Sequence, residues 1–128
     1  MAPDLASELF VAASLACVAS ALMHSLLGEA WLVGPLVRTR SGAMSRPIAR
    51  QVTRLAWHWT SALWLMVAGV LISAGLGHPV DTWLLACIGG VHLVLGLFDA
   101  VVTRGRHLGW PLLILIGGLT LLALLQTR

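Results

Sequence analysis

The chain has 128 residues, of which 59% are hydrophobic and 10% are charged. A soluble domain of this length needs a far larger polar surface, so the composition excludes a water-soluble globular protein and indicates an integral membrane protein. The net charge is +3, with eight arginines, no lysine and five acidic residues. Most arginines lie in connecting segments, which indicates a role in membrane topology and not in nucleic-acid binding.

Four apolar segments approach the ~20 residues that a membrane-spanning helix requires. The first follows an acidic start that lacks the positive region of a signal peptide, so we interpret it as a retained helix. We expect a single all-α domain over residues 1–128, an integral membrane four-helix bundle of two hairpins embedded in the lipid bilayer. The predicted spans are residues 5–27, 52–76, 80–103 and 108–125.

The connections between these helices differ in length and charge. Residues 28–51 form the one sizeable predicted loop, with four arginines and with Gly-Pro and Arg-Pro pairs that break the helical pattern. Residues 104–107 are short and basic, whereas residues 77–79 make a tight turn. By the positive-inside rule, both basic connections lie in the cytoplasm of a bacterial-type inner membrane, and both termini lie outside.

Histidines on the predicted helices are the main functional signal. An ionisable side chain inside a membrane-spanning segment is costly, so it is a functional-site hypothesis by default. Small residues line helix contacts in lipid, and four histidines share faces with such residues, while His78 lies in an outer turn. The four are His24, His58, His92 and His107, and Asp99 shares the face of His92.

The depth of these residues predicts a cluster. At a rise of ~1.5 Å per residue, His24 and His58 lie within roughly two turns of the cytoplasmic ends of their helices. Asp99 lies about one turn from the same end of its own helix, Glu29 follows the first helix and His107 begins the fourth, whereas His92 is about two turns deeper and therefore secondary.

Two kinds of cofactor suit such a cluster. Three imidazoles and a carboxylate can hold zinc, iron or copper in a helix bundle, and the predicted metal ligands are His24, His58, His107, Glu29 and Asp99. Haem b is the other cofactor, with two of the three histidines as axial ligands, glycines making room for the ring and arginines pairing with the propionates. Helix order around the bundle decides between them, and the sequence does not fix that order.

Single histidines near helix ends also have a plain structural role, bonding a backbone carbonyl or a lipid phosphate. The preferred function is therefore binding of a metal ion or haem, for electron transfer, metal handling or membrane-associated oxidation, and enzymatic activity stays open. The alternative is a cofactor-free accessory subunit or assembly factor of a larger membrane complex. Gly89 and Gly96, on the face of His92, are expected to contact another helix closely. Homo-oligomerisation through Gly89, Gly96, Gly117 and Gly118, and a small transporter or proton relay using His92 and Asp99, are further hypotheses. Cys17 and Cys87, inside apolar runs, are expected to be inert.

Overall fold

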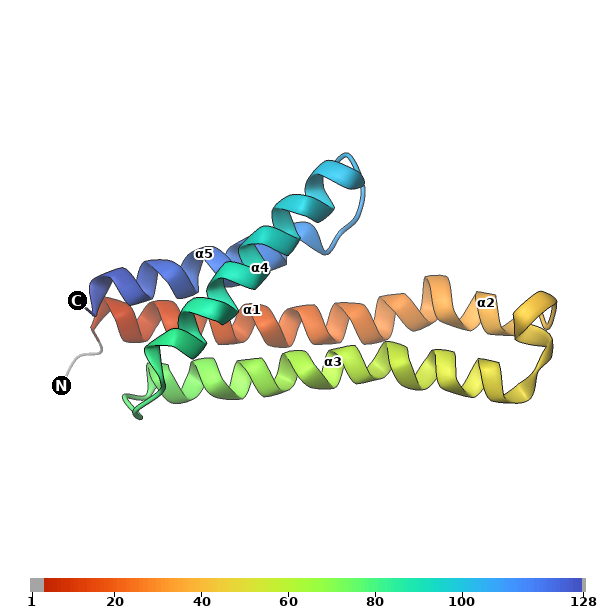
Figure 1. Ribbon diagram of the computed structural model, residues 1–128, viewed down its shortest axis with the longest axis horizontal. Coiled ribbons are helices and arrows are strands. Elements are labelled where there is room, and N and C mark those ends of the chain that lie inside the picture. Colours follow the sequence, from red (N-terminus) through yellow and green to blue (C-terminus); the bar gives the residue numbers. More distant parts are fainter. Residues whose placement is uncertain (1–3, 128) are drawn as a thin grey trace.

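The computed structural model describes residues 4–127, and its regular structure is helical over that range (Figure 1). The first helix is followed directly by a π-turn and a short α-helix, and a 3-10 turn leads into the second long helix. In chain order the elements are α1 (Leu5–Gly28), η1 (Glu29–Val33), α2 (Gly34–Arg38), η2 (Gly42–Ser45), α3 (Pro47–Gly75), α4 (Thr82–Val102) and α5 (Trp110–Gln126).

The long loop predicted for residues 28–51 is wrong. The chain continues as one helical body of 34 residues to Arg38, and α3 begins at Pro47. Pro35 does not end the first body because a wide π-turn precedes it, in which the Gly34 N–H donates to the carbonyl of Glu29, five residues back. That turn relieves the clash between a proline ring and the preceding turn of an α-helix.

Between residues 4 and 127, three helical bodies are long and apolar enough to cross a membrane, namely Leu5–Arg38, Pro47–Gly75 and Thr82–Val102. The fourth predicted span corresponds to α5, which is apolar but has 17 residues, or about 25 Å of helix. The start of α4 is set by Asp81, whose carboxylate accepts a 2.8 Å hydrogen bond from the N–H of Leu84. This cap satisfies an N–H that has no partner within the helix.

The helices pack in the order α3, α1, α5, α4, with α1 in contact with both α3 and α5. Helices α3 and α4 meet at the turn that joins them and then diverge toward the other end of the molecule (Figure 1). The buried core lies near the start of α1 and the end of α5, where Phe10, Leu71 and Ile116 pack together. Cys17 is fully buried in this core as a free thiol.

Glycines let α4 and α5 approach closely, as the sequence predicted for Gly89 and Gly96. A Cβ on Gly96 would lie 2.8 Å from the backbone nitrogen of Ile114, and one on Gly117 would lie 2.4 Å from the backbone nitrogen of Leu93. Gly89 meets Leu121 in the same interface. These three glycines are therefore used for packing within the chain.

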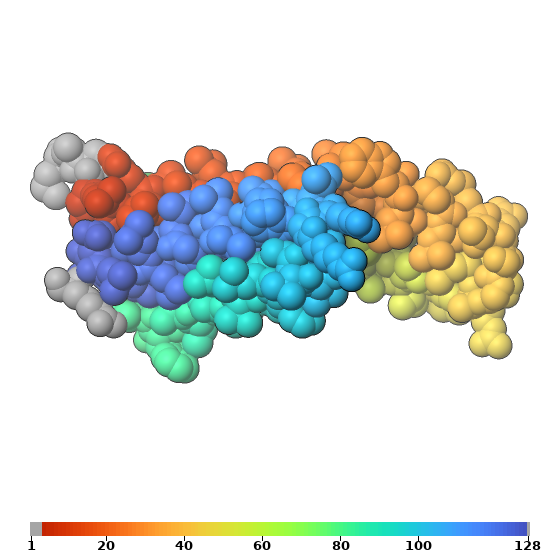
Figure 2. All heavy atoms as spheres, turned by 90° about the horizontal axis from the view of Figure 1, so that it is seen from above, coloured from red at the N-terminus to blue at the C-terminus, as the bar shows by residue number. Residues whose placement is uncertain are grey.

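The end of the molecule that carries α2, η2 and the start of α3 extends past the α4–α5 turn (Figure 2). The body that includes α1 and α2 has 34 residues, whereas α4 has 21. His24, about three-fifths of the way along the longer body, consequently lies near the level of the α4–α5 turn, with which it lines one pocket.

Candidate functional site, a pocket between the first helix and the last turn

A pocket of about 380 Å³ lies between α1, α3 and the α4–α5 turn. Leucines of α1 and α5 line much of it, together with Trp31, Trp57 and Trp64. A few polar side chains face this apolar space, namely Ser20, His24, Arg106 and His107. A mostly apolar pocket with a small number of polar groups is the usual form of a small-molecule or cofactor site.

The ring of His24 is held on three sides. It stacks on Trp57 with a centroid separation of 4.2 Å and an interplanar angle of 9°, and the edge-on ring of Trp64 is 5.2 Å away. Its Nδ1 lies 3.2 Å from the Oγ of Ser61 on α3. Because Nδ1 is engaged in this way, Nε2 is the nitrogen of His24 that is available to an occupant of the pocket.

Trp57 reaches this position because residue 28 is glycine. The indole Nε1 donates a 2.8 Å hydrogen bond to the backbone carbonyl of His24, and a Cβ on Gly28 would lie 2.5 Å from the indole ring. The glycine therefore provides the surface on which the indole rests, and the indole in turn orients His24.

Replacing Gly28 with alanine is expected to displace Trp57 and to lower the free energy of unfolding by about 1–3 kcal/mol, the usual cost of overpacking. Tryptophan fluorescence and unfolding in denaturant measure the two effects. Gly69→Ala is the control, because a Cβ at Gly69 meets no atom within 4 Å. Equal effects of the two substitutions would show that the contact between Gly28 and Trp57 is not needed.

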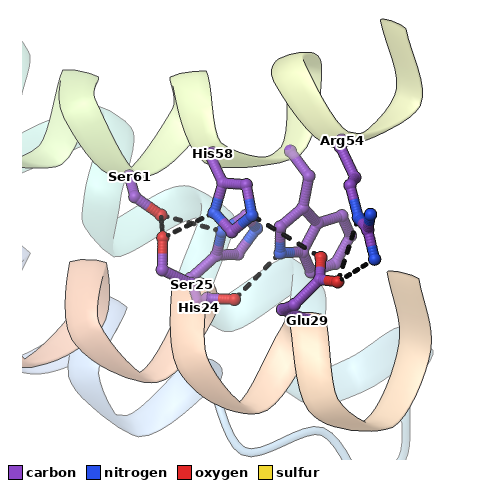
Figure 3. A network of polar contacts seen from close by, with 7 residues as sticks. His24, Ser25, Glu29, Arg54, His58 and Ser61 are labelled. Carbon is purple, nitrogen blue, oxygen red and sulfur yellow. Dashed lines mark hydrogen bonds and ion pairs between the residues drawn. The ribbon is translucent and has the colours of Figure 1, made fainter. Parts of the chain in front are cut away.

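Beside His24, a polar network joins α1 to α3 (Figure 3). The Ser25 hydroxyl donates to Ser61 at 2.9 Å and lies 3.0 Å from Nδ1 of His58. His58 then points its Nε2 toward Oε2 of Glu29, 3.6 Å away. Glu29 accepts hydrogen bonds of 2.6 and 3.0 Å from Arg54 through its other oxygen, so the carboxylate links His58 to a fixed positive charge.

Ser20 lies one helical turn from His24 and lines the same pocket. It is 6% exposed, and its hydroxyl has no hydrogen-bond partner within residues 4–127. Buried hydroxyls are normally paired, since an unpaired one costs about 1–3 kcal/mol. A polar atom of a bound molecule would supply the missing partner.

The opposite wall of the pocket carries a second histidine that is oriented by a carboxylate. Nδ1 of His107 lies 2.6 Å from Oδ2 of Asp99, near the end of α4. The ring rests against Gly109, where a Cβ would lie 2.7 Å from its Cε1. A carboxylate on Nδ1 fixes the tautomer and makes Nε2 the more basic ligand nitrogen, as in many metal-binding histidines.

The residues predicted to converge are thus placed in two clusters. His24, Glu29 and His58 lie together on α1, η1 and α3, and Asp99 pairs with His107 at the α4–α5 turn. Helix order explains the separation, because α1 stands between the helix of His58 and the α4–α5 hairpin. Within the described part of the chain, no group of three or more His, Cys, Asp or Glu side chains is placed to hold a metal ion.

His92 lies apart from both clusters. It is buried, and its Nδ1 is 2.8 Å from the carbonyl of Ile88 on its own helix. Asp99 bonds His107, so the predicted relay between His92 and Asp99 has no direct contact to support it.

Sequence reasoning missed several members of the site. Ser61 and Ser20 were visible as small residues on the faces of His58 and His24, but their roles as a hydrogen-bond bridge and as an unpaired hydroxyl were not. Trp57 resembles an ordinary membrane-interface tryptophan in the sequence, which gives no sign of its contact with His24. Searches against protein-family models, curated proteins and solved structures found no match to this chain. Function is therefore inferred from the pocket and its polar residues.

Proposed function

We propose that the chain is an inner-membrane four-helix protein that binds haem b in this pocket, with His24 and His107 as axial ligands, and that it transfers electrons. The observation that carries the proposal is the pair of imidazoles on two walls of one pocket, each engaged through Nδ1. Each ring therefore has Nε2 left for iron, and Asp99 strengthens the donor nitrogen of His107.

The lining of the pocket favours haem over a bare divalent metal ion. Structural zinc sites take four ligands and catalytic ones three, whereas only His24 and His107 offer donor nitrogens here. Flat indole rings suit the faces of a macrocycle, and Arg106 at the pocket suits a propionate. Of the two predicted cofactors, haem and a divalent metal ion, haem is therefore the one that the pocket supports better.

The alternative, a cofactor-free accessory subunit, needs a free surface for its partner. Its predicted contact surfaces were the glycine faces, and Gly89, Gly96 and Gly117 pack against α4 or α5 within the chain. Gly118 differs from these three glycines, because a Cβ at Gly118 would meet no atom within 4 Å.

The absorption spectrum of the purified protein, with haem analysis and elemental analysis, tests the proposal. We expect a b-type spectrum of six-coordinate low-spin haem, about one haem per chain, that changes on reduction. Protein that stays colourless after expression with ample haem, and that contains no metal, would overturn the proposal in favour of the accessory subunit. A stoichiometric metal without porphyrin would favour the divalent-ion site.

We also propose that the basic ends of the helices lie in the cytoplasm and both termini outside. The turn between α2 and α3 and the turn after α4 carry the arginines that set orientation. Reporter fusions after Gln126 and near Ser41 are expected to be active on opposite sides of the membrane, the first outside. A cytoplasmic C-terminus would contradict this and would move the pocket to the other membrane face.

A further inference from the structure

We infer that His24, Ser61, Ser25 and His58 form a proton path between the pocket and the surface beside Glu29 (Figure 3). His24 is the one member of the path that lines the pocket, whereas Ser25, Ser61 and His58 do not line it and can be replaced without changing its lining. Its coupling to the oxidation state of haem rests on the proposed function, whereas the path itself does not.

The path is continuous from ring to ring. The distances are 3.2 Å from His24 Nδ1 to Ser61 Oγ, 2.9 Å from Ser61 Oγ to Ser25 Oγ, and 3.0 Å from Ser25 Oγ to His58 Nδ1. With Ser25 donating to Ser61, Nδ1–H of His58 donates to Ser25 and Ser61 donates to Nδ1 of His24. Every link then has one donor and one acceptor, as proton exchange along hydroxyls requires.

Proton transfer from the surface to the pocket leaves each group on the path with the same number of protons as before. If His24 releases the proton on Nε2 to the pocket, its Nδ1 takes one from Ser61, Ser61 takes one from Ser25, and Ser25 takes one from Nδ1 of His58. His58 regains a proton at Nε2 from the surface. Each O–H or N–H bond that breaks is replaced by one that forms, so neither serine changes its charge and one proton has moved inward.

Proton transfer in the opposite direction, from the pocket to the surface, uses the same atoms. When Nε2 of His24 is a metal ligand, its Nδ1 carries the proton and donates to Ser61, which donates to Ser25, which donates to Nδ1 of His58. A gain of positive charge in the pocket then favours moving a proton outward, leaving His58 as an imidazolium. A redox-active metal held by His24 would supply such a change of charge.

The two rings at the ends of the path have different surroundings. The side chain of His58 is 43% exposed, and its Nε2 faces Oε2 of Glu29 at 3.6 Å, an oxygen that makes no hydrogen bond to the chain between residues 4 and 127. His24, by contrast, lies between two indole rings. The other charged or titratable groups near the pair are Arg54, Arg106, His107 and Asp99.

The path is tested without haem by following the ring-nitrogen NMR signals of ¹⁵N-histidine in the purified full chain during a pH titration. In the wild type, we expect the signals of His24 to shift as His58 titrates, because the two rings belong to one hydrogen-bonded chain. In Ser25→Ala, the signals of His24 should no longer follow His58, whereas Ser25→Thr, which keeps the hydroxyl, should behave as the wild type.

Ser73→Ala is the control, since the Ser73 hydroxyl bonds the Gly69 carbonyl of its own helix. Two results would overturn the path: His24 signals that ignore His58 in the wild type, or coupling that persists in Ser25→Ala. Electrostatic interaction through space would survive that substitution, so persistent coupling would assign the effect to charge alone. Circular dichroism confirms that each variant is folded.

A second measurement tests the coupling to haem. The reduction potential of haem in the wild type should depend on pH, and Ser25→Ala should lose most of that dependence while retaining haem. A potential that is independent of pH in the wild type would overturn the coupling. Protein without haem would contradict the proposed function alone, and the NMR titration would then decide on the path.

Discussion

If the proposed function holds, replacing His24 with alanine is expected to reduce haem content from about one per chain to near zero, because the substitution removes one of the two proposed ligands. His107→Ala should have the same effect, since its ring is the other proposed ligand and also lines the pocket. Asp99→Asn should be milder and weaken retention about 10–100-fold, the usual effect of losing a carboxylate that orients a metal-binding histidine. The ratio of haem absorbance to protein after purification measures all three.

His78→Ala and His58→Ala are the controls for this series. His78 is exposed in the turn before α4, and His58 is absent from the lining of the pocket, so both variants should keep full haem content. Near-stoichiometric haem in the His24/His107 double variant would show that neither ring is a ligand. Loss of haem in His58→Ala would instead favour the larger three-histidine cluster predicted from the sequence.

Replacing Gly117 with alanine is expected to cause the largest loss of stability among the single substitutions considered. The new Cβ would lie 2.4 Å from the backbone nitrogen of Leu93 and 2.7 Å from the backbone oxygen of Gly89. Backbone atoms cannot turn away as a side chain can, so α4 and α5 must separate. We expect the free energy of unfolding to fall by about 3 kcal/mol, at the upper end of the overpacking range.

The neighbouring residue provides a matched control. A Cβ on Gly118 meets no atom within 4 Å, so Gly118→Ala should leave the free energy of unfolding nearly unchanged. Gly89 and Gly90 form a second pair of the same kind on α4, the first packed and the second open. Equal destabilisation within either pair, measured by unfolding in denaturing detergent, would contradict the observed interface between α4 and α5.

The existence of the long helices was predictable because hydropathy and length report burial in lipid directly. The residues at which these helices begin and end were less predictable. Asp81 caps α4 through a side-chain hydrogen bond, and this moves its start two residues past the predicted one. Pro35 indicated a break, yet the helix continues, because the π-turn before it removes the clash that makes proline a helix breaker.

The helix faces that carry the candidate site residues were predictable from the sequence, but the way in which these faces meet was not. The small-residue face of His24 does pack against α3, where Ser61 meets its Nδ1. The predicted meeting of His58 with His107 depended on which helices are neighbours. In the structure, α1 packs between α3 and α5, so the helix of His58 is not a neighbour of the hairpin that carries His107. This arrangement depends on all the helices together and cannot be inferred from the sequence of any one of them.

The π-turn at η1 contains one residue more than a regular α-helical turn, and this extra residue keeps the buried face of the helix continuous. Ala21 and Val33 are both buried, yet 12 residues of regular α-helix would place them about 120° apart around the axis. The extra residue in the wide turn reduces that angle to about 20°, so the buried stripe continues across it. Deletion of the exposed Ala30, combined with replacement of Pro35 so that no proline ring meets the preceding turn, would therefore restore an ordinary α-helix without turning Val33 outward. A homologue one residue shorter at this point and without that proline would keep the same buried stripe, and an alignment gap there would mark loss of the wide turn beside Glu29 and not a change of fold.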